Sequence, residues 1–286
     1  MPSLQASLAV AALSGVLALA SASGSTLLAG GVALVVLIFT LGAVSAARVP
    51  AARWSAAVAV AAAGGALAWT WADETSDLTP IAALLAPTLL VSIVVQLLRQ
   101  DGRARLTASL AYSVTACVLA VLPVCWLALH ASPDGHYAVA LALLGVGAVG
   151  LTEVVPISRA VRRLIGVLVA AVGTGVLVLT TGWVSEAVPA VSAVVVATFA
   201  GLMAAVSFAA VDRLAEEFRP QPVPVSVSVG EPAGADDGSS DPGDGVAADP
   251  GAALPRGAAA FLPLRVSLPF VAAAPAAYVL GRIFVG

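Results

Sequence analysis

The chain has 286 residues, of which 60% are hydrophobic and 10% are charged, and its mean hydropathy is +1.03. Soluble domains carry about 25% charged residues, so a soluble core could not hide this much apolar surface and lipid must solvate most of the chain. The net charge of -3 is unevenly distributed, because six of the 16 acidic residues lie between Glu231 and Asp249. This composition excludes a soluble enzyme, and we expect no nucleic-acid partner.

Several kinds of chemistry lack the residues that they need. All 13 basic residues are arginine, which excludes Schiff-base and P-loop mechanisms that depend on lysine. Cys117 and Cys125 lie eight residues apart in one apolar run. That spacing is roughly 12 Å along a helix, too far for a disulfide, so we expect two packing thiols. Together with only two histidines, His130 and His136, they do not suggest a metal cluster, and no metal or cofactor is expected.

Nine runs are long and apolar enough to be transmembrane helices, which need about 20 residues each. Because backbone in lipid must satisfy its own hydrogen bonds, the sequence predicts an all-α, polytopic transmembrane helical bundle. An alternative for the first run is a signal peptide, since Ala20-Ser21-Ala22 resembles a cleavage site, but no basic residue precedes the run. The runs cover residues 4–22, 25–47, 54–71, 80–98, 106–129, 137–156, 164–184, 188–210 and 260–284.

The connections between these runs alternate in charge. Every second connection contains arginine and the others contain none, so the positive-inside rule predicts a cytoplasmic N-terminus and an external C-terminus. Aromatic residues at the predicted outer ends would form an interfacial belt: Trp69, Trp71, Trp126, Tyr137 and Trp183. The arginines of the inner connections are Arg48, Arg53, Arg99, Arg103, Arg105, Arg159, Arg162, Arg163, Arg213 and Arg219.

The composition changes abruptly after the eighth run. Residues 219–257 are rich in Pro, Gly, Ala and Asp and contain no aromatic residue, so we expect a disordered cytoplasmic linker that could bind a protein partner. It separates an eight-helix region, 1–218, from a final helix within 258–286. In that helix Arg265 and Arg282 are expected to reach the headgroups near the two ends, and Pro269 and Pro275 to kink it.

Glu153 is the only acidic residue that we place within a span, about one turn from its inner end. An intramembrane carboxylate is a functional-site hypothesis, and the alternative is simple pairing with Arg159 or Arg162 at headgroup level. Its depth favours pairing. We expect no second buried acid beside it, and we assign Asp212, Arg213 and Glu216 to local pairing at the end of the eighth helix.

One glycine motif also lies within a span. Gly145, Gly147 and Gly150 match the dinucleotide fingerprint G-x-G-x-x-G. That fingerprint functions between a strand and a helix, where the helix N-terminus meets the pyrophosphate. In the middle of an apolar run the motif indicates close helix packing instead.

A basic turn and long span (QLLRQDGRARLTASLAYSVTACVL, 96–119), the turn Pro133-Asp134-Gly135 and the last helix (LRVSLPFVAAAPAAYVLGRIF, 264–284) form a recognisable layout. This layout resembles that of bacterial phosphatidate cytidylyltransferases. These membrane enzymes make CDP-diacylglycerol from CTP and phosphatidic acid, usually with nine helices. The resemblance is specific around residues 96–150 and 264–283.

The chain departs from that family where catalysis depends on it. Gly150 lies near the position of the family's metal-binding aspartate, with Glu153 only nearby, and the family's lysine motifs cannot be present. The acidic segment replaces the family's C-terminal signature, of which Arg265 and Ser267 alone could be remnants. The resemblance therefore implies a degenerate, non-catalytic member, since CTP transfer needs cations and divalent metal to offset phosphate charge.

We accordingly expect a non-enzymatic scaffold or accessory protein of the bacterial cytoplasmic membrane, with no catalytic residues and with the lipid bilayer as its surroundings. One alternative is a phospholipid-biosynthesis enzyme that carries out nucleotidyl transfer. In that case Glu153 and inner arginines would contact a phosphate headgroup: Arg99, Arg103, Arg159, Arg162 and Arg163. The other alternative, a small-solute transporter, would need paired polar residues in the spans, which the sequence does not provide.

Overall fold

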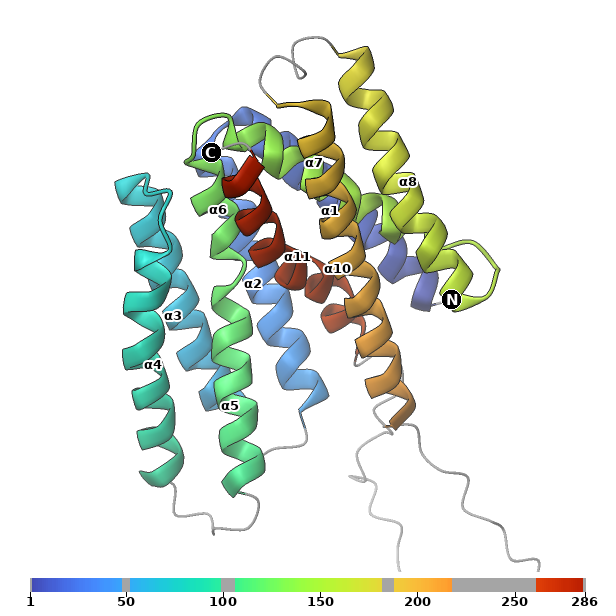
Figure 1. Cartoon of the computed structure of the whole chain (residues 1–286). Coiled ribbons are helices and arrows are strands. Elements are labelled where there is room, and N and C mark those ends of the chain that lie inside the picture. The colour runs from blue at the N-terminus through green and yellow to red at the C-terminus, as the bar shows by residue number, and fades with distance from the viewer. Residues whose placement is uncertain (1, 48–51, 99–105, 182–187, 218–260, 285–286) are drawn as a thin grey trace, which may run out of the picture.

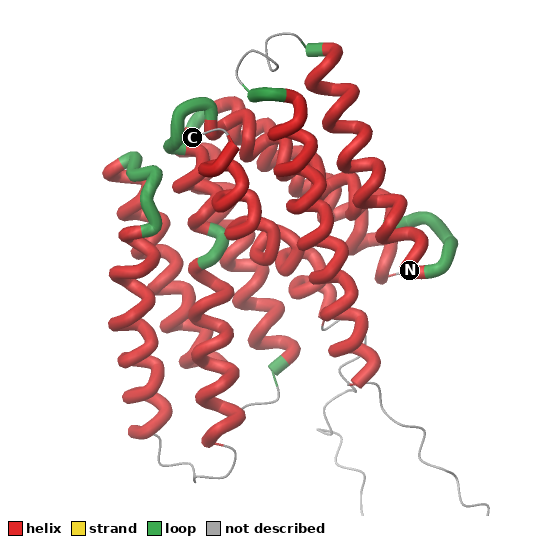
Figure 2. The backbone as a smooth tube through the Cα atoms, in the orientation of Figure 1, coloured by secondary structure: helices red, strands yellow, loops and turns green. Residues whose placement is uncertain are grey.

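The computed structural model describes residues 2–47, 52–98, 106–181, 188–217 and 261–284. In this part of the chain all regular structure is helical, as Figure 2 shows, and nine segments are long and apolar enough to cross a membrane. The prediction of an all-α transmembrane bundle is therefore confirmed. The predicted linker 219–257 lies outside the described residues, and so do Arg99, Arg103 and Trp183. The helices are α1 (Pro2–Ser23), α2 (Ser25–Ala46), α3 (Ala52–Asp73), α4 (Thr79–Leu98), α5 (Leu106–Val121), α6 (Val124–His130), α7 (Gly135–Thr152), α8 (Arg159–Thr180), α10 (Ala190–Glu217) and α11 (Leu262–Phe284).

Two helices form the centre of the bundle. Helix α7 packs on α1, α8 and α10, and α11 packs on α10, α2 and α6. Helices α3, α4 and α5 form a group at the left of Figure 1, and α8 lies at the right edge. Of the apolar windows, 61% of α7 is buried, against 17% of α4 and 22% of α8. The outer helices therefore present apolar faces to their surroundings, including Leu97 (66% exposed) and Leu179 (77%), which lipid can solvate and water cannot.

The glycine motif in α7 lies where α1 and α10 approach this helix closely. A Cβ on Gly145 would lie 2.3 Å from the carbonyl oxygen of Ala197 in α10. On Gly147 and Gly150 it would meet side chains of α1, at 2.2 Å from Ser14 Oγ and 2.8 Å from a Val10 methyl. The predicted interpretation as a packing motif is confirmed, because the absent side chains let both backbones approach α7.

The fifth predicted span is broken by a proline. Pro123 has no N–H group, so the helix ends at Val121 and restarts as α6, with a tight turn closed by the bond from the Cys125 N–H to the Leu122 carbonyl (3.0 Å). The break places the Trp126 ring inside the bundle, where it is 2% exposed and donates to the Phe270 carbonyl of α11 (3.1 Å). The expectation that Trp126 belongs to an outer aromatic belt is therefore wrong, whereas Trp69 and Trp71 are exposed.

A buried polar cluster joins the three helices α3, α4 and α5. The Gln96 amide, 3% exposed, donates to Ser113 Oγ (2.7 Å) and Ser55 Oγ (3.2 Å), and its carbonyl accepts from Ser109 (2.7 Å). The Ser113 hydroxyl in turn donates to the Ser109 carbonyl (2.9 Å). Both the amide nitrogen and the amide oxygen of Gln96 are engaged in hydrogen bonds. This cluster therefore links apolar helices to one another.

Substitution of Gly145 by alanine tests the close approach of α10 to α7. The added methyl group meets backbone, which cannot move aside alone, so we expect Gly145→Ala to destabilise the protein by about 1–3 kcal/mol. The matched control is Gly64→Ala, where a Cβ has no heavy atom within 4 Å and the change should be neutral or slightly stabilising. Thermal unfolding in detergent, followed by circular dichroism, compares the two variants, and equal midpoints would contradict the packing assignment.

Candidate functional site, a buried cluster of arginines and carboxylates

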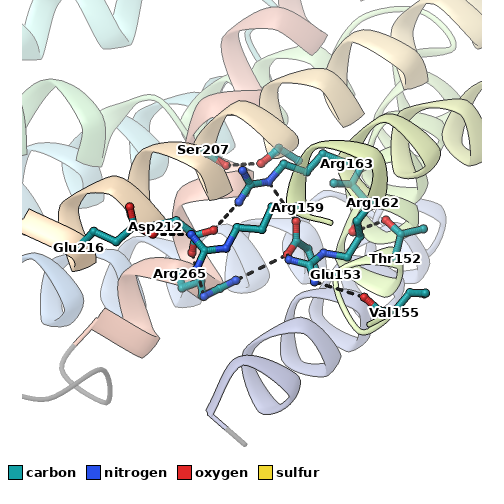
Figure 3. A network of polar contacts seen from close by, with 12 residues as sticks. Thr152, Glu153, Val155, Arg159, Arg162, Arg163, Ser207, Asp212, Glu216 and Arg265 are labelled. Carbon is teal, nitrogen blue, oxygen red and sulfur yellow. Dashed lines mark hydrogen bonds and ion pairs between the residues drawn. The ribbon is translucent and has the colours of Figure 1, made fainter. Parts of the chain in front are cut away.

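Five charged side chains from four helix ends meet in one place (Figure 3). Glu153 directly follows α7, and the short turn after it leads into α8, which carries Arg162 and Arg163. Asp212 lies near the end of α10, and Arg265 lies near the start of α11. We refer to these five residues as the charge cluster.

Glu153 is at the centre of the charge cluster, and its side chain is only 1% exposed. Its Oε2 lies 2.7 Å from an Arg162 terminal nitrogen and 3.6 Å from one of Arg265, and its Oε1 accepts from Arg163 Nε at 3.1 Å. A carboxylate buried without partners would be strongly unfavourable. Three guanidinium groups from two other helices therefore stabilise it.

Asp212 forms the second centre, at 11% exposure. Its Oδ2 accepts from Arg163 at 2.5 Å, and its Oδ1 lies 3.1 Å from Arg265. Arg163 and Arg265 thus each contact both carboxylates, and the Arg265 guanidinium also lies 5.9 Å from the centre of the Phe208 ring. The two acids and the two bridging arginines form a closed ring of ion pairs.

Helix dipoles oppose this arrangement of charges. Arg162 and Arg265 lie in the first turns of α8 and α11, where the dipole favours acids, and Glu153 lies at the C-terminal end of α7, where it favours bases. The charges therefore derive their stabilisation from one another across helices. Because the cluster has three arginines and two carboxylates, it carries one surplus positive charge.

A second ion pair borders the charge cluster. Arg159 donates to Glu216 at 2.5 Å and links the start of α8 to the end of α10. Both side chains are more than half exposed, at 56% and 52%. Such a pair contributes little to stability compared with the buried contacts of Glu153.

The structure brings together some of the predicted site residues and adds others. Glu153 pairs with Arg162 as expected, but Arg159 pairs with Glu216 instead. The sequence did not lead us to expect a second acid beside Glu153, but the partly buried Asp212 shares two arginines with it. The local pairing assigned to Asp212 and Glu216 is wrong, since both contact α8.

Arg265 also differs from its prediction. Its side chain is 19% exposed and contacts both acids rather than extending to the headgroups. The sequence holds one signal for the Asp212 part of this network. Asp212 lies seven residues after Ala205 and four after Phe208, which are both buried, so it lies on the inward face of α10.

The charge cluster joins helices through ion pairs. Both carboxylates are engaged by arginine, and among the described residues no group of three or more His, Cys, Asp and Glu side chains could hold a metal ion. What the cluster does do is join α7, α8, α10 and α11 at one end of the bundle. It also holds the end of α10 beside the start of α11.

Substitution of Glu153 by glutamine tests the central role of this carboxylate. It removes the buried charge that three partly buried guanidinium groups share, so we expect Glu153→Gln to destabilise the protein by about 3–5 kcal/mol. The control Glu216→Gln removes the same charge from the exposed pair and should cost less than about 1 kcal/mol. Unfolding in mixed detergent micelles measures both, and a Glu153 effect no larger than the Glu216 effect would refute the assignment.

Comparisons with known proteins add no further assignment. A scan against models of protein families, a search of curated proteins and a search of solved structures each found no match. The resemblance to phosphatidate cytidylyltransferases therefore remains a prediction from residues 96–150 and 264–283. The charge cluster and the membrane-spanning fold are the features from which function must be inferred.

Proposed function

We propose that the chain is a non-catalytic, multi-pass protein of the bacterial cytoplasmic membrane. It serves as a scaffold or accessory protein built on a cytidylyltransferase-like bundle. The observation that carries the proposal is the pairing of Glu153 and Asp212 with three arginines at 2.5–3.6 Å. Nucleotidyl transfer needs carboxylates that hold divalent metal at the phosphates. Here the acids hold helices together instead.

A second candidate is an enzyme that acts on a phospholipid headgroup. The surplus positive charge of the charge cluster favours it, because Arg162, Arg163 and Arg265 each remain 14–19% exposed beside two neutralised acids. Arginine clusters near the cytoplasmic surface attract anionic headgroups. This candidate requires the same residues to be both the structural centre of four helices and a substrate site.

A turnover assay distinguishes the two candidates. The assay mixes the purified protein with CTP, magnesium and phosphatidate in mixed micelles. We expect no release of pyrophosphate, because arginines engage both carboxylates of the charge cluster. Release that is abolished in Arg162→Gln and retained in Arg213→Gln would reject the scaffold proposal in favour of the enzyme. Arg213 is a suitable control, since it is exposed and neighbours Asp212 in sequence.

The proposed orientation places the charge cluster toward the cytoplasm. The ends of α3 and α6 and the start of α7 lie at one end of the bundle, and the end of α7 and the start of α8 lie at the other (Figure 1). The alternation of arginine along the sequence assigns the second end to the inside. The turn between α3 and α4 is then external and the turn between α7 and α8 is cytoplasmic.

Cysteine labelling in intact cells tests this orientation. Both native cysteines are buried and free, so Cys117→Ala and Cys125→Ala provide a background without thiols. In that background we expect an impermeant maleimide to label Asp77→Cys in whole cells and Ser158→Cys only after the membrane is opened. The reverse pattern would invert the topology.

A further inference from the structure

A small cavity lies at the opposite end of the bundle from the charge cluster. It has a volume of about 260 Å³ and lies between the start of α2, the end of α3 and the end of α6. Its polar lining comes from Ser25, Thr70, Trp71, Glu74 and His130. Neither the charge cluster nor the proposed scaffold role accounts for this cavity.

The cavity has a negative character. Of the described residues that line it, Glu74 is the only one with a formal charge at neutral pH. Glu74 directly follows α3 and adopts φ +47°, in the left-handed region that L side chains rarely adopt. Asp73 and Asp77 flank it in sequence, so the potential around the cavity attracts cations.

The other walls favour an organic cation. The Trp71 indole N–H lies 3.4 Å from Thr26 Oγ1 of α2, so the ring spans the gap between the two helices. The face of an indole attracts ammonium groups through its quadrupole. His130 Nε2 lies 3.0 Å from the Ser21 carbonyl, which only accepts, so Nε2 is the donor in this contact.

We propose that this cavity binds a small organic ammonium ion. Its positive charge would pair with the Glu74 carboxylate, and its alkyl groups would lie against Trp71. A hard metal ion fits less well, since calcium takes six to eight oxygen ligands and the cavity supplies one carboxylate. The volume is below the roughly 300–1,000 Å³ of sites for drug-sized ligands, which limits the ligand to a small amine or quaternary ammonium group.

Binding of tetramethylammonium and of ethanolamine to the full chain in nanodiscs tests the proposal. Saturation-transfer NMR titrations yield a dissociation constant for each probe, with potassium chloride at equal ionic strength as the blank. We expect binding in the millimolar range. Glu74→Gln should weaken it about fivefold, as befits one exposed charge contact, and Trp71→Leu should weaken it by a similar factor.

Matched controls lie in the same part of the chain. Asp77→Asn removes the same charge, and Trp69→Leu removes the same ring, from exposed positions that do not line the cavity. Both should retain the affinity of the unaltered protein. Equal weakening by Glu74→Gln and Asp77→Asn would show general charge attraction only, and no saturable binding of either probe would also overturn the proposal. Because all four positions are exposed, unchanged melting temperatures are expected and would exclude misfolding.

Discussion

At one end of the bundle, the packing of α7, α8, α10 and α11 depends on the requirement that buried charge be paired. Glu153 is almost completely buried, and in apolar surroundings a lone carboxylate would cost more than a helix contact provides. The three arginines that neutralise it come from α8 and α11, and Asp212 of α10 balances two of them. Side chains from helices distant in sequence are therefore held in one arrangement, and the contacts make the positions of four helix ends interdependent.

Two other forms of packing complement this ion-pair network. In the centre, Gly145, Gly147 and Gly150 of α7 have no side chains, so α1 and α10 can approach the α7 backbone. In the group of α3, α4 and α5, the Gln96 amide satisfies three hydroxyl groups at once. Both solutions follow from the same constraint, because apolar attraction between helices is weak where lipid is the solvent.

For the part of the chain that the structure describes, the sequence predicted the nine spans, the fold class and the packing role of the Gly145 motif, since hydropathy and residue size are local properties. It also predicted that Glu153 pairs with Arg159 or Arg162, which both lie close in the chain, and the structure shows the pair with Arg162. It did not predict Asp212 and Arg265 as members of one network. Local sequence patterns suggested helical pairing for Asp212 and contact with the headgroups for Arg265. Only the packing of α10 against α11 brings these two side chains together. The burial of Trp126 was missed because it depends on the break at Pro123.

The contact between Asp212 and Arg265 has a consequence for the connection between α10 and α11. Together with the packing of α10 on α11, it holds the end of one helix beside the start of the other. For added flexible residues, the entropy of closing such a connection rises only with the logarithm of length, by about 0.6 kcal/mol per doubling. The connection can therefore diverge in length and composition during evolution without disturbing the bundle.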